Sequence, residues 1–113
     1  MRDNNVRRGS FEYYIHQNMV AVAVDLGFGV IAQLVVKLRG VFVEDSEALS
    51  AYFADLVDAD ILVRHYDKPA QQAFYLVELF VEREGEETLL SINHDLIEKG
   101  IVKKWSGSKD ANN

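Results

Sequence analysis

The chain has 113 residues, of which 49 % are apolar and 11 % aromatic, and its formal net charge is −6. This composition excludes a disordered or low-complexity chain, and the length suits one domain with one core rather than two. Because the sequence contains no cysteine, it also excludes a disulfide framework, a thiolate metal site and a cysteine nucleophile.

No segment of the sequence has the length of a membrane-spanning helix. The longest apolar run, from Met19 to Val24, is far below the roughly 20 residues that such a helix needs. The arginines near the start are not followed by the apolar segment of a secretion signal. We therefore expect a soluble, cytoplasmic protein that does not associate with a membrane.

The charges are unevenly distributed along the chain. Acidic residues dominate between Glu44 and Asp60, where no lysine or arginine occurs. Such a surface repels a phosphate backbone, so general binding to nucleic acid is disfavoured and a protein is the expected partner. Basic residues occur in the amino-terminal arm, at Lys37 and Arg39, and in 99–109, and they would form a local site for an anionic ligand if the fold brought them together.

The first elements in chain order are predicted to be strands. Residues 1–10 are mostly polar, so we expect a flexible arm there. Aromatic and β-branched residues in 11–15 favour a first strand. The apolar runs 19–24 and 30–38 are predicted to pair as a hairpin over a Gly-Phe-Gly turn at 27–29, because glycine readily adopts positive φ.

A helix is predicted next, followed by two more strands. Asp45 stands in the position of an N-cap, and apolar residues then recur at one-face helical spacing as far as Val57. Strand composition returns at 61–66 and at 73–81. The Asp-Lys-Pro group at 67–69 predicts the turn between these two strands, which we expect to be neighbours.

A second helix is predicted near the end of the chain. Ser91 or Asn93 would cap it, and Gly100 would end it. The ordered domain is predicted to cover 11–105, followed by a flexible tail at 106–113. The order βββ-α-ββ-α predicts an α+β, mainly β fold: a small five-stranded OB-like (oligonucleotide/oligosaccharide-binding) Greek-key barrel with two flanking helices.

Two separated motifs resemble one known family. Residues 24–30 read VDLGFGV, and 37–40 read KLRG at the end of the second hairpin strand. This arrangement resembles the phage-type branch of the staphylococcal-nuclease-like (thermonuclease) family, whose members carry a variant of DGDT…DLGFG…RLRGIDAPE. Residues 90–101, LSINHDLIEKGI, are similar to the family's helix motif xVNExLVxxGLA. The resemblance covers about 11–103 and implies the same barrel.

The resemblance also implies where the catalytic groups would stand, and these positions are altered. The family cleaves phosphodiesters with a calcium ion held by two aspartates, a glutamate that activates water, and two arginines. Asn18 and Phe42 fall at the aspartates, Asp45 at the glutamate, and Lys37 and Phe74 at the arginines. Asparagine lacks the negative charge that calcium needs, and phenylalanine has no ligand atom. We therefore expect no cofactor, no metal and no catalysis.

The function expected from this pattern is binding without catalysis. We expect a catalytically inactive nuclease-like domain that contacts a protein, as a phage accessory or a host-directed, for example anti-defence, factor in the host cytoplasm. Two alternatives stay open: a residual metal-dependent nuclease that uses Glu44, Asp45 and Lys37, and a non-catalytic single-stranded nucleic-acid binder. The candidate binding residues surround the altered positions: Arg39, Phe42, Glu44, Asp45 and Glu47.

Overall fold

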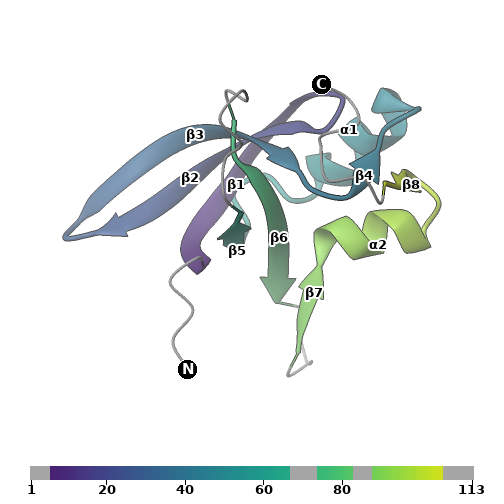
Figure 1. The fold of residues 1–113 in the computed structure, drawn as a ribbon. Helices are drawn as coiled ribbons and strands as arrows, with labels where there is room; N and C mark the ends of the chain where they lie inside the picture. The colour runs from purple at the N-terminus through teal and green to yellow at the C-terminus, as the bar shows by residue number, and fades with distance from the viewer. Residues whose placement is uncertain (1–5, 67–73, 83–87, 106–113) are drawn as a thin grey trace.

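The computed structural model describes residues 6–66, 74–82 and 88–105, and its main feature is a closed β-barrel (Figure 1). Five strands form the barrel wall: β1 (Val6–His16), β2 (Met19–Gly27), β3 (Val30–Leu38), β5 (Asp60–His65) and β6 (Leu76–Glu82). Antiparallel pairing runs through β3, β2, β1, β5 and β6. A short parallel pairing of β3 with β6 closes the barrel, which confirms the predicted OB-like architecture.

The remaining elements lie around the barrel. The helix α1 (Ser46–Ala54) connects the β3 side to β5, and α2 (Ile92–Glu98) follows the short strand β7 (Leu89–Ser91), which extends the sheet beyond β6. Two further two-residue strands pair with each other: β4 (Val41–Phe42) and β8 (Lys103–Lys104). Figure 1 shows β8 beside β4 and α2 running past them.

The core lies between the barrel wall and the two helices, α1 and α2. Phe11 from β1 and Phe53 from α1 are both fully buried, with ring centroids 4.6 Å apart and nearly parallel planes. Leu49, one helical turn before Phe53, is also buried, so the predicted apolar face of α1 is the face that covers the barrel. Burying each of these large side chains contributes about 1.5–3 kcal/mol to folding.

The predicted hairpin and both helix caps are local features that the structure bears out. β2 and β3 pair from Met19 opposite Lys37 to Gly27 opposite Val30, across a turn in which residues 27–29 all have positive φ. Asp45 caps α1, because its side chain accepts the N–H groups of Glu47 and Ala48. For α2 the cap is Ser91 rather than Asn93.

Two predicted boundaries are wrong. β1 begins at Val6, so 6–10 belong to a strand paired with β5 rather than to a flexible arm. β6 begins at Leu76, and Phe74 precedes it. The rest of the predicted arm (1–5), the turn at 67–69, the strand start at 73 and the tail (106–113) lie outside the described residues. Within the described part of the chain, no helix is long and apolar enough to cross a membrane.

Candidate functional site

Three of the positions implied by the nuclease resemblance lie where β1, β3 and β6 approach one another. Lys37 is buried at the end of β3, and its Nζ is 5.5 Å from the centroid of the Phe74 ring. Asn18 is buried in the turn before β2 and donates from Nδ2 to the carbonyl of Leu38 at 3.1 Å. The side chains at these positions therefore take part in closing the barrel.

The other two positions have structural partners on the β4 side. Phe42 is half-buried, and its ring centroid is 6.5 Å from that of Trp105. The Asp45 carboxylate is engaged with two amide groups at the start of α1. The candidate acid Glu44 forms an ion pair with Lys103 at 3.0 Å, while Glu47 is exposed on the first turn of α1.

The structure does not assemble a metal site from these residues. In 6–66, 74–82 and 88–105, no group of three or more histidine, aspartate or glutamate side chains is arranged to hold a metal ion. A hard cation such as Ca²⁺ needs six to eight oxygen ligands with several carboxylates among them. The acidic residues 44, 45 and 47 instead serve as an ion-pair partner, a helix cap and a first-turn acid.

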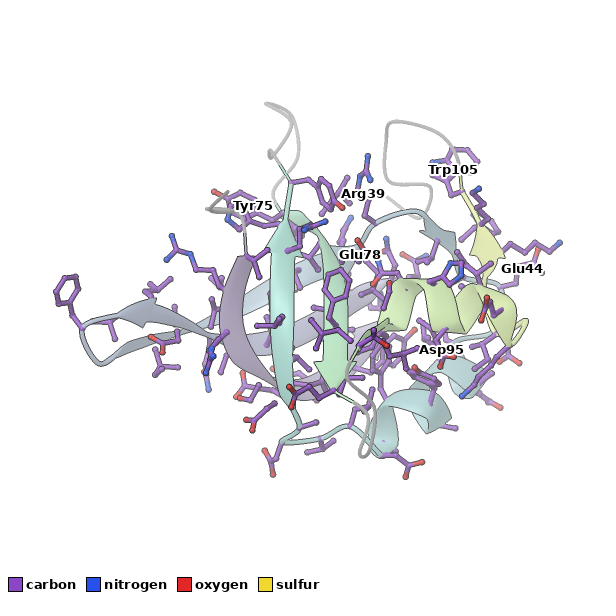
Figure 2. The ribbon with its side chains drawn as sticks, turned by 90° about the horizontal axis from the view of Figure 1, so that it is seen from below. Arg39, Glu44, Tyr75, Glu78, Asp95 and Trp105 are labelled. Carbon is purple, nitrogen blue, oxygen red and sulfur yellow. The ribbon has the colours of Figure 1, made fainter. Side chains whose placement is uncertain are left out.

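A groove of about 240 Å³ lies next to the altered positions, between the end of β3, β6, the start of α2 and β8. Figure 2 shows Arg39, Glu78 and Trp105 in this part of the molecule. The described lining residues are Arg39, Gly40, Tyr66, Glu78, Asn93, His94, Ile97, Lys104 and Trp105. Of the candidate binding residues from the sequence, only Arg39 belongs to this groove.

One wall of the groove is a fixed chain of polar contacts. The Arg39 guanidinium lies over the Tyr66 ring, with its Cζ 4.1 Å from the ring centroid. Tyr66 donates its hydroxyl to Glu78 at 3.3 Å, and Ser91 donates to the other Glu78 oxygen at 2.6 Å. Stacking on a ring leaves the in-plane N–H groups of an arginine available, so Arg39 is oriented to receive a planar anion such as a carboxylate.

The floor of the groove is held by Asn93. Its Nδ2 donates to the carbonyls of Arg39 at 2.8 Å and Val77 at 3.0 Å, and its Oδ1 accepts from the N–H of Leu79 at 3.1 Å. Asn93 is 6 % exposed. One side chain therefore joins α2, β6 and the turn after β3, which fixes the backbone that carries Arg39.

The opposite wall carries a cation and an aromatic ring. Lys104 is exposed on β8. Trp105 is 40 % exposed, although its ring contacts Phe42 and its backbone N–H donates to the carbonyl of Gly40 at 2.9 Å. The indole of Trp105 thus packs against Phe42 of β4, with part of the ring left at the surface. The groove can accept an anionic group at Arg39 and Lys104 and an apolar group at Trp105.

Sequence reasoning missed most of this groove. Tyr66, Glu78 and Asn93 are far apart in the chain and meet only through the pairing of β5 with β6 and the placement of α2. One signal was present for Asn93, since it precedes the buried Leu96 by three residues and so lies on the same helical face.

Comparisons of the chain with protein-family models and with curated proteins find no match. The likeness to the nuclease family therefore rests on the two sequence motifs.

Proposed function

We propose that this chain is a catalytically inactive, nuclease-like barrel that binds another protein through the Arg39 to Trp105 groove. The observation that carries the proposal is that Arg39, Tyr66 and Trp105 line one groove. Arginine, tyrosine and tryptophan are the residue types most enriched among the energetic hot spots of protein interfaces. A segment with a carboxylate close to an apolar side chain matches the chemistry of the two walls.

The altered catalytic positions support an inactive domain. Lys37 lies beneath the Phe74 ring, Glu44 is paired with Lys103, and the Asp45 carboxylate caps α1. A residual nuclease that uses these three side chains would have to break each of these contacts. The resemblance to phage-borne proteins further suggests an accessory role toward a host protein, by analogy of fold rather than by chemistry.

Panning a random peptide library on the immobilised protein tests the proposal. Selected peptides should carry aspartate or glutamate near an aromatic or aliphatic residue. Replacing Arg39 or Trp105 by alanine should weaken their binding by at least about 2 kcal/mol, as expected of hot-spot residues. The control is Arg7→Ala, which removes an exposed arginine of β1 outside the groove. Peptides that bind both groove variants as tightly as the parent would contradict the proposal.

A second candidate function has one observation in its favour. Arg39 and Lys104 converge on the same groove as the rings of Tyr66 and Trp105, which is the combination that single-stranded nucleic acid requires. The net charge of −6 opposes it. Titration with fluorescent oligonucleotides at two salt concentrations decides between the two. Salt-sensitive binding tighter than about 10⁻⁵ M that is lost in Arg39→Ala would favour the nucleic acid.

A further inference from the structure

The β2–β3 hairpin continues beyond the closed barrel as a projecting arm, defined here as residues 25–35 (Figure 1). β1 pairs with β2 only as far as Val24, and β6 pairs with β3 only at Lys37 and Leu38. Within the described residues, 25–27 of β2 pair only with 30 and 31 of β3, whereas 32–35 of β3 pair with 21–24 of β2, which also pair with β1. Five large apolar side chains of the arm are exposed: Leu26, Phe28, Val30, Ile31 and Leu34.

The apolar surface of the arm continues the inner face of the barrel. Side chains alternate along a strand, and the pairings Val22 with Leu34 and Val24 with Ala32 place these four residues on one face. Val22 and Val24 are buried in the core, whereas Leu34 is exposed. The arm thus carries core-type side chains past the point where the barrel can cover them.

Phe28 at the tip of the arm is held in a costly position. It is fully exposed, and its φ is +55°, in the left-handed region that bulky residues rarely adopt. Gly27 and Gly29 on either side also have positive φ. Strain and exposure together at one aromatic residue indicate a contact that the isolated chain does not make.

The free edge of β3 lacks the features that prevent strands from pairing between molecules. Exposed edge strands are usually short, charged or interrupted by proline. Residues 26–36 contain no charged residue and no proline. Within the described residues, no strand pairs with the outer side of 30–36, so its main-chain groups are open to an added strand, with apolar side chains next to them.

We propose that the occupant of this edge is the β3 arm of a second copy of the chain. Two identical strands related by a two-fold axis pair antiparallel, so the contact is self-complementary. The two tips then point in opposite directions, and each Phe28 lies along the partner's β3 toward its barrel. This inference uses none of the groove residues and stands independently of the proposed function.

Charge and area favour a second copy over other occupants. Each molecule carries a net charge of −6, and the uncharged segment 26–36 is a place where two copies can approach with little repulsion. The five exposed side chains offer several hundred Å² per copy, so two arms approach the roughly 1,200 Å² at the low end of stable protein interfaces. Every copy of the chain carries the same β3 edge, so a second copy is present wherever the chain is made.

Sedimentation-velocity ultracentrifugation over a range of concentrations tests the proposal. We expect the parent to change from 12.8 kDa to twice that mass as its concentration rises through the micromolar range. Ile31→Lys should weaken the dimer at least tenfold, because lysine blocks edge pairing and Ile31 is 60 % exposed on the outer face of the arm. Val57→Lys is the matched control, since Val57 is 50 % exposed outside the arm, and it should leave the dimer unchanged.

A second variant separates the interface from folding. Phe28→Gly relieves the left-handed strain and removes the aromatic contact. It should therefore leave the melting temperature of the dilute monomer unchanged or higher while weakening the dimer at least tenfold. A parent that stays monomeric at about 1 mM, well above the concentrations at which specific dimers form, would overturn the proposal. A dimer that tolerates both Ile31→Lys and Phe28→Gly would overturn it as well, as would binding to lipid vesicles or to another protein through a monomeric arm.

Discussion

Replacing Asn93 by alanine should be among the most damaging single changes in the groove, although Asn93 is a small polar residue. Its side chain makes three hydrogen bonds to backbone groups of the turn after β3 and of β6. None of these groups is in the helix that carries Asn93. The substitution therefore removes three polar contacts between α2 and the barrel and leaves the helix itself intact.

The expected cost follows from these contacts. Each hydrogen bond contributes about 0.5–1.5 kcal/mol net, and a buried group that loses its partner costs about 1–3 kcal/mol. The Val77 carbonyl keeps the Arg39 N–H as a second donor at 2.8 Å, whereas the buried Leu79 N–H loses its side-chain acceptor. We expect a loss of about 2–5 kcal/mol, a large part of the 5–15 kcal/mol typical of a whole domain.

Urea unfolding followed by circular dichroism measures this loss, and the dependence of the unfolding free energy on urea concentration should stay the same as in the parent. The control is His94→Ala at the next position, where an exposed contact between His94 Nε2 and Glu98 Oε1 at 3.0 Å is removed and about 0–1 kcal/mol is expected. Asn93→Asp keeps the acceptor for Leu79 but sets a carboxylate against two carbonyl oxygens, so it should be at least as destabilising as alanine. If Asn93→Ala unfolds within about 0.5 kcal/mol of the His94 control, the assigned role of Asn93 is refuted.

Three further predictions concern the barrel and the helix cap. Gly9→Ala should destabilise strongly in urea unfolding, because a Cβ at this position would lie 2.1 Å from the carbonyl oxygen of Ala23; a variant as stable as the parent would contradict this. Burial raises the pKa of Tyr14 above its ordinary 10.0, so the neutral phenol is favoured in the folded state and the free energy of unfolding should fall as pH rises past 10. Tyr14→Phe should reduce that fall, and a variant with the same pH profile as the parent would contradict this prediction. Asp45→Ala should lower the free energy of unfolding by about 1 kcal/mol through the lost cap, and Glu47→Ala should lower it by less. We expect no calcium-dependent cleavage of DNA by the parent or by either variant.

The parts of the fold that sequence reasoning predicted are those determined by neighbouring residues. The hairpin of β2 and β3 follows from glycine at 27 and 29 between two apolar runs. The two runs pair with each other on either side of this turn. The start of α1 follows from Asp45, whose carboxylate reaches amides two and three residues ahead. In both cases the decisive interaction spans only a few residues, so the local pattern contains the information.

The parts that it missed depend on partners far along the chain. Residues 6–10 look like an arm because their side chains are mostly polar, but their backbone pairs with β5, which lies 50 or more residues later. β4 and β8 have two residues each and become strands only because they lie side by side. The groove has the same origin, since Glu78 receives hydrogen bonds from Tyr66 and Ser91 across two strand pairings.

The two proposed contact surfaces, the groove and the free edge of β3, lie at opposite ends of β3. β6 occupies the edge of β3 at Lys37 and Leu38, where the barrel closes, and Arg39 follows immediately at the groove. The rest of that edge, 30–36, is where the arm of a second copy would pair. Because the segments do not overlap, pairing of two arms would not use the groove residues. A dimer would then present two grooves, and two modest contacts to one partner assembly would add to a much tighter one.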